Sequence, residues 1–274
     1  MRRKKTISVL IPVYIKENPV YLEECLNSIV NQTLLPDEVV ICIDRSITEN
    51  LQLVIEKFST KLEIKKIIYS GHDKLGGSLS LGILNCKNEY IFRMDADDVC
   101  HKYRFEKMLK FFISNRLDVL GCWTREFNKD INDSDRVRTT PTEVTELNGN
   151  FRNPFNHPSV LLRKSSVIKA GNYAPCDGFE DWYLWLRMKK MKMRMKNLSD
   201  VLVYQRIGND FEARRSGLSY VDNEFKALSL WRKEKLIKNS TFIVSVFTRT
   251  LVRFLPKKVL IAFYDKFLRT KVQY

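Results

Sequence analysis

Short apolar runs alternate with helical segments over residues 1–125, and this alternation leaves few folds open to the chain. Strands are predicted where apolar and β-branched residues run together, at 7–13, 38–43, 64–69, 90–94 and 118–122. Helices are predicted where apolar residues recur every three or four positions, at 21–31, 51–58, 78–84 and 104–114. Because strand–helix–strand units cross over with one hand, the pattern predicts an α/β fold with a mainly parallel sheet.

The remainder of the chain divides into two further parts. Residues 125–150 are polar, and we interpret them as a connection or mobile loop. Ordered signals then return, with strands predicted at 159–163 and 201–206 and helices at 181–190 and 220–235. We therefore expect three parts, at residues 1–125, 126–220 and 221–274.

Three carboxylates, Asp95, Asp97 and Asp98, directly follow the predicted strand 90–94. Acids this close repel one another, and each is costly to bury unpaired. A divalent cation resolves that conflict, and hard oxygen ligands suit Mn²⁺ or Mg²⁺ while leaving positions open for phosphate oxygens. A solvated acidic turn or helix cap is the alternative. The place at the end of a buried strand favours the metal site.

The first two strands also end in candidate ligand-binding residues. Pro12 and Tyr14 stand at the end of the first strand, and Asp44 ends the second, where a carboxylate can accept hydrogen bonds from a base or ribose. Each signal is weak alone, since Pro and Asp are common in turns. Ligands of open parallel sheets gather at the carboxyl ends of the strands, so these residues are expected to meet Asp95 there.

A second acidic pair, Glu180 and Asp181, opens the predicted helix 181–190. Acids at a helix N-terminus complement the helix dipole, which is one explanation for the pair. The functional explanation gives one carboxylate the role of general base, within hydrogen-bond reach of an acceptor hydroxyl. The neighbouring Trp182 is a candidate for stacking on a sugar, although helical spacing requires that some of the aromatic residues here lie in the core.

Two further sites carry weaker signals. His157 stands in a loop before a predicted strand, and structural and acceptor-binding roles are both open. Arg214 and Arg215 lie between a strand and a helix, where they could contact a diphosphate or form a solvated basic turn.

Charge and hydropathy indicate where the chain works. The formal net charge is +15, and much of it falls after Trp231, in a stretch that also carries periodic apolar residues. This composition fits amphipathic helices at an anionic membrane surface, with packing onto the rest of the protein as the alternative. The apolar run at 7–13 is too short for a signal sequence, and the six cysteines show no CxxC pair. We expect a cytoplasmic protein, peripheral on the inner face of the plasma membrane.

Taken together, these motifs resemble the family-2 inverting glycosyltransferases that build bacterial O-antigen, capsule or exopolysaccharide. The likeness rests on residues 8–14, 28–33, 36–40, 93–98, 153–157, 169–173, 179–187 and 202–206. It implies the A-type glycosyltransferase fold, in which a Rossmann-like sheet binds the nucleotide sugar. On this basis 1–125 would be the nucleotide-sugar half and 126–220 the acceptor half with the catalytic base. Residues 221–274 would be a helical extension, either associated with the membrane or packed on the catalytic domain.

The resemblance also assigns roles to single residues. Asp44 would contact the uracil or ribose, while Arg93, Asp95 and Asp97 match the nucleotide-sugar and metal motif, with Asp97 as the direct ligand of Mn²⁺ or Mg²⁺. Asp181 matches the family's general base. The implied reaction transfers one sugar from a UDP-sugar, with galactose as the leading candidate, to a lipid-diphosphate-linked saccharide.

Two departures and two rival classes bear on this interpretation. Members often have Asp-Gly-Pro-Leu where this chain has Asp44-Arg-Ser-Ile, and Ser80 replaces an Asn of the next helix. A basic nucleic-acid-binding protein would explain the charge, but not the two acidic clusters, so no nucleic-acid partner is expected. A metal-dependent nucleotidyltransferase would want a Gly-rich loop after the first strand, and none is present.

Overall fold

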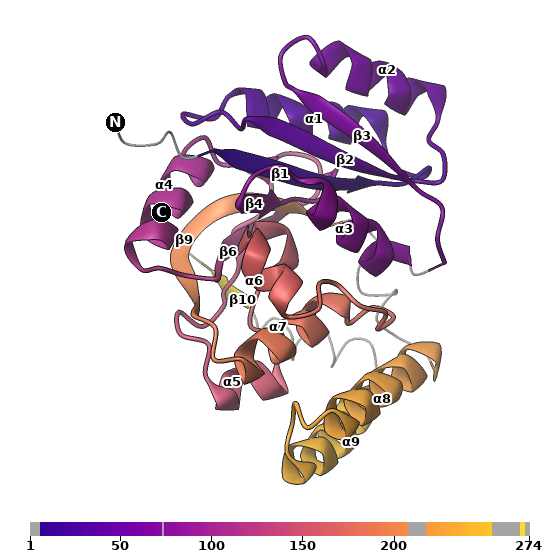
Figure 1. Cartoon of the computed structure of the whole chain (residues 1–274), viewed down its shortest axis with the longest axis vertical. Helices are drawn as coiled ribbons and strands as arrows, with labels where there is room; N and C mark the ends of the chain where they lie inside the picture. Colours follow the sequence, from indigo (N-terminus) through magenta and orange to yellow (C-terminus); the bar gives the residue numbers. More distant parts are fainter. Residues whose placement is uncertain (1–5, 73, 208–217, 254–268, 272–274) are drawn as a thin grey trace.

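The fold is built on one mixed sheet, shown in Figure 1 with helices packed on both of its faces. The computed structural model describes residues 6–72, 74–207, 218–253 and 269–271. Its described strands follow the order β10-β7-β6-β8-β4-β1-β2-β3, and β9 pairs with both β6 and β5. The strands are β1 (Ile7–Val13), β2 (Glu38–Asp44), β3 (Ile64–Tyr69), β4 (Tyr90–Arg93), β5 (Val99–Cys100), β6 (Val119–Phe127), β7 (Arg136–Arg138), β8 (Leu161–Arg163), β9 (Met195–Arg206) and β10 (Arg269–Lys271).

The N-terminal half is the parallel part of the sheet, as predicted. Strand β1 pairs in parallel with β2 and with β4, and β2 pairs in parallel with β3. The helices of this half are α1 (Pro19–Val30), α2 (Glu49–Phe58), α3 (Lys74–Asn85) and α4 (Arg104–Ser114). The Asn18 side chain caps α1, and Pro19 at its first position supplies a backbone angle suited to a helix start.

The side chains of β1 alternate between two cores, as the pleat of a strand requires. Ile7, Val9 and Ile11 belong to the core under α1, α2 and α4. Leu10 faces the opposite core, which α3 and the later helices cover. Both cores are continuous with the C-terminal half, so the two halves share one sheet.

The prediction of a loop over residues 125–150 was wrong. Strand β6 continues to Phe127, the short edge strand β7 pairs with it, and α5 (Glu146–Phe151) follows. Strand β8 also inserts antiparallel between β4 and β6, so the sheet is mixed in this region.

The remaining helices complete the second face. They are the short turn η1 (His157–Ser159), α6 (Lys164–Lys169), α7 (Glu180–Lys190), α8 (Leu218–Lys233) and α9 (Asn239–Arg253). Helix α8 packs through Leu228 and Trp231 against α7, and an ion pair between Glu224 and Arg249 joins α8 to α9. Within the described chain, no helix is long and apolar enough to cross a membrane.

Candidate active site

The carboxyl ends of the parallel strands meet at one edge of the sheet. Leu10 of β1 lies beside Arg93 of β4, and both strands run toward the loop that carries the three aspartates. The side chain of Asp44, at the end of β2, is 41% exposed, and Tyr14 is 43% exposed just beyond β1. Pro12 is half-buried within β1. The placement leaves polar groups open to a ligand at this edge.

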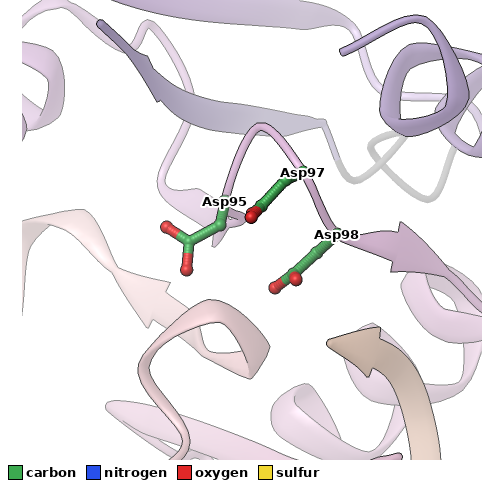
Figure 2. Close-up of side chains that lie close together, drawn as sticks. All are labelled: Asp95, Asp97 and Asp98. Carbon is green, nitrogen blue, oxygen red and sulfur yellow. The ribbon is translucent and has the colours of Figure 1, made fainter. Parts of the chain in front are cut away.

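Asp95, Asp97 and Asp98 form a compact acidic cluster in the loop between β4 and β5. One carboxylate oxygen from each lies within 4.8 Å of the others. Figure 2 shows the three side chains on the same side of the loop. Three oxygen ligands on one short loop are suited to a hard divalent cation.

Burial and mutual repulsion dominate the electrostatics of this cluster and outweigh the nearby Arg93 and Arg206. Burial and the neighbouring Asp95 raise the pKa of Asp97 to about 6, and the same causes raise the pKa of Asp98 well above its ordinary value. The Oδ2 atom of Asp98 is buried and has no hydrogen-bond partner among the described residues. The cluster therefore fits a divalent cation, which would offset the repulsion and satisfy that oxygen.

Arg93 fixes the first acid of the cluster. Its guanidinium is 2% exposed and lies 2.6 Å from a carboxylate oxygen of Asp95. Its Nε and Nη1 atoms have no hydrogen-bond partner in the described chain, although both are buried. The end of β4 thus carries a buried cation that is paired with the acidic loop.

Arg206 holds the loop from the other side, and sequence reasoning did not single it out. Its backbone N–H donates to Asp98 Oδ1 at 2.9 Å, and its Nε donates to the backbone oxygen of Asp97 at 3.1 Å. The guanidinium also pairs with Glu24 and lies 3.8 Å from the ring centroid of Tyr21. Arg206 therefore positions the loop without competing for the free carboxylate oxygens.

The second acidic pair begins α7, as predicted. The Asn153 side chain donates to Asp181 Oδ2 at 2.5 Å, which orients that carboxylate. Glu180 lies against Gly76 of α3, where an added Cβ would come within 3.3 Å of the Glu180 side chain. Burial and the charge of Asp181 raise the pKa of Glu180 to about 7, while Arg93 acts in the opposite direction.

Tyr173 connects the two acidic groups. Burial raises its pKa, and the charges of Asp181, Glu180 and Asp95 all act on it in the same direction. Arg93 acts in the opposite direction, so the pKa of Tyr173 responds to charges of both acidic groups.

His157 is half-buried beside Tyr173. Its Nε2 atom is 2.9 Å from the hydroxyl of Tyr173, and its ring packs near Trp185. Burial and the nearby charge of Arg93 lower its pKa well below the ordinary value, so the ring is neutral at pH 7. Its contacts favour the structural role that the sequence left open.

The sugar-stacking role considered for Trp182 is not supported. The side chain is 4% exposed, its ring packs 5.0 Å from that of Trp231, and its Nε1 donates to the backbone of Gly149. Trp182 is a core residue that attaches α7 to α8. Arg214 and Arg215 lie outside the described residues.

Comparison with known proteins identifies the class. A profile of glycosyl transferase family 2 matches residues 8–171. The chain belongs to this family and is a glycosyltransferase. This membership excludes the two rival classes as the main activity.

Two relatives cover nearly the whole chain. An uncharacterized glycosyltransferase of Haemophilus influenzae is 37% identical over 268 residues, covering 96% of this chain and 98% of the relative. The UDP-Gal:alpha-D-GlcNAc-diphosphoundecaprenol beta-1,3-galactosyltransferase of Escherichia coli is 33% identical over 264 residues, covering 96% of each chain.

A solved structure confirms the expected fold. S. aureus TarS 1-349 in complex with UDP-GlcNAc superposes with a TM-score of 0.68 at 19% identity, covering 96% of this chain and 73% of that chain. At that identity the likeness concerns the fold alone.

Proposed function

We propose that the chain transfers a single sugar from UDP-galactose to a saccharide linked to a lipid diphosphate, at the inner face of the plasma membrane. The observation that supports this proposal is a compact acidic cluster suited to a metal, in a chain that also holds an oriented carboxylate, Asp181, at the start of α7. The choice of galactose and of a lipid-linked acceptor is supported by the name of the E. coli relative.

The acidic cluster has the groups to hold the donor's diphosphate side. Asp97 and Asp95 would bind Mn²⁺ or Mg²⁺, with Asp98 supporting them from the buried side. A bound divalent cation supplies a Lewis acid for the negative charge that grows on the departing nucleoside diphosphate. In this proposal Asp44 and Tyr14, which are exposed at the ends of β2 and β1, would contact the nucleoside.

Asp181 has the features of the general base. Asn153 holds its Oδ2 atom, so the orientation of the carboxylate is set before an acceptor arrives. In the proposed step the acceptor hydroxyl oxygen forms a bond to the anomeric carbon as the bond to the diphosphate breaks. The hydroxyl proton passes to Asp181, and the anomeric centre is inverted.

The proposal is tested by incubating the full chain with UDP- and GDP-sugars, Mn²⁺ or EDTA, and a lipid-diphosphate sugar acceptor. Mass spectrometry is expected to detect one added hexose with UDP-galactose and Mn²⁺ and none with EDTA. Transfer from another donor would retain the reaction but overturn the choice of sugar. Failure of every nucleotide sugar to bind or react would overturn the proposal.

Arg206→Gln is expected to loosen the metal loop. Removing the buried guanidinium and its hydrogen bonds to the loop should cost about 2–3 kcal/mol of stability and weaken Mn²⁺ binding. Urea unfolding and Mn²⁺ titration measure the two effects. Arg194→Gln, on an exposed arginine, is the matched control and should change neither. Unchanged Mn²⁺ affinity in Arg206→Gln would contradict the positioning role.

Glu180→Gln is expected to stabilise the protein at high pH and not at low pH. A folded-state pKa of about 7, against the ordinary 4.5, means that charging Glu180 destabilises the fold as the pH rises above 4.5, with the full cost reached above 7. Gln removes that charge, so the gain should reach about 2 kcal/mol at pH 8 and vanish near pH 4, after allowing for partial exposure. Thermal unfolding at the two pH values measures it, and Glu56→Gln on α2 should show no such difference.

A further inference from the structure

A basic cleft lies at the opposite end of α7 from the catalytic carboxylates. Its volume is about 970 Å³, and it is bounded by the ends of α7 and α8 and the start of α9. Lys189, Lys190 and Lys192 line it from the α7 side. Arg232, Lys233, Lys235 and Lys238 line it from the α8 side. No carboxylate residue is among the described residues that line it.

Internal structure accounts for only part of this charge. Lys190 donates to the backbone oxygen of Glu234 at 2.8 Å, and Arg232 lies 4.6 Å from the ring centroid of Phe242. For Lys192, Lys233 and Lys235, the described residues provide no carboxylate partner. The dipoles of α7 and α8 favour some positive charge at their last turns, but not a cluster of seven cations.

The backbone places two of these lysines just past the helix ends. Lys192 and Lys235 both have φ of +56°, after α7 and α8. Helices commonly end in this left-handed conformation with Gly or Asn, because a Cβ is strained there. Arg116 adopts the same conformation after α4, so the turns set where the lysines stand and the charge of the cleft carries the argument.

An exposed apolar ridge begins at the same place. Ile243 lines the cleft and is 65% exposed, and Phe247, one turn further along α9, is also 65% exposed. Val244 extends this surface. Cations beside exposed apolar side chains match an anionic bilayer, whose headgroups are negative and whose interior is apolar. A nucleic acid would meet the cations but gain nothing from the ridge.

We propose that the basic cleft and the α9 ridge form the surface that docks the protein on an anionic phospholipid bilayer. The lysines bind lipid phosphates, while Ile243 and Phe247 enter the interface. One part of this proposal rests on the proposed function, namely that docking brings the enzyme to a lipid-linked acceptor. Lys190 at the cleft lies nine positions after Asp181 in α7, roughly 14 Å along the helix. Docking through the cleft would therefore hold the catalytic base within roughly 14 Å of the bound headgroups.

The test measures vesicle binding by the full chain without any nucleotide sugar. Vesicles contain phosphatidylcholine alone, or three parts phosphatidylcholine to one part phosphatidylglycerol. The cleft variant combines Lys192→Asn, Lys233→Gln and Lys235→Asn, because Asn tolerates the left-handed backbone. The control combines Lys61→Gln, Lys66→Gln and Lys110→Gln, three exposed lysines with the same summed charge outside the cleft.

The wild type and the control are expected to bind anionic vesicles and to leave neutral ones free. The cleft variant should lose roughly a hundred-fold in partition coefficient at low ionic strength. Phe247→Ser, which leaves the charge unchanged, should lower partitioning several-fold as well. Any contribution of the C-terminal tail is the same in all variants, so the difference reports on the cleft.

Three results would overturn the proposal. The first is equal binding of neutral and anionic vesicles, and the second is an equal loss of binding in the cleft variant and the control. The third is that the wild type binds a duplex oligonucleotide, and the cleft variant loses this binding but still binds vesicles. Transfer to a water-soluble acceptor should be normal in the cleft variant. Absence of transfer in the wild type would count against the proposed reaction, and the vesicle result would still decide the docking surface.

Discussion

Asp181→Asn is expected to lower kcat by roughly 10²–10⁴-fold while the affinity for the nucleotide sugar stays unchanged. The amide matches the carboxylate in size, and its oxygen can still accept the hydrogen bond from Asn153 that orients residue 181. It cannot accept a proton from the acceptor hydroxyl. The loss should therefore fall on the chemical step and not on binding of the donor.

Single-turnover transfer followed by mass spectrometry measures this effect, with donor affinity determined separately by calorimetry. Asp177→Asn, in the exposed turn before α7, is the matched control and should retain activity. If Asp181→Asn remained active while Glu180→Gln lost transfer, the base would be Glu180. Its raised pKa and its contact with Gly76 would then describe the catalytic carboxyl group.

The parallel core could be predicted because its signal is local. Strands β1 and β2 are buried on both faces, so they form continuous apolar runs bounded by turns. Strand β7 could not be predicted in this way. It has three residues, and only Val137 is buried, so its pairing with β6 depends on tertiary contacts that leave no period in the sequence.

The same distinction applies to the site. Asp95, Asp97 and Asp98 are neighbours in the chain, and their position after a strand was enough to predict the cluster. Arg206 reaches Asp98 across 108 residues of sequence, and it gives no local sign of that contact. Trp182 is the opposite case. It directly follows the two acids in the sequence, but its ring packs against Trp231 in the core.

Asp97→Asn should abolish metal-dependent transfer and yet stabilise the metal-free protein. Loss of the cation's electrostatic contribution is worth several kcal/mol, so kcat/KM should fall by about 10³-fold. Stability should change in the opposite direction. The pKa of Asp97 is raised from 3.8 to about 6, so its charge destabilises the metal-free fold as the pH rises through that range. At pH 8 the variant should gain about 1–2 kcal/mol, discounted for the partial exposure of the side chain.

Transfer assays test the expected loss of activity, and thermal unfolding at pH 8 in EDTA and in Mn²⁺ tests the expected gain in stability. Mn²⁺ should raise the Tm of the wild type and not that of Asp97→Asn. The rise in the wild type should disappear as the pH falls below about 6, because protonated Asp97 cannot bind a metal. Asp222→Asn, on the exposed surface of α8, should behave as the wild type in every arm. A structural carboxylate would lose stability together with activity when replaced. A gain in stability in EDTA, a loss of activity and a loss of the Mn²⁺-dependent rise in Tm are together expected if the acids are held together for the sake of a cation.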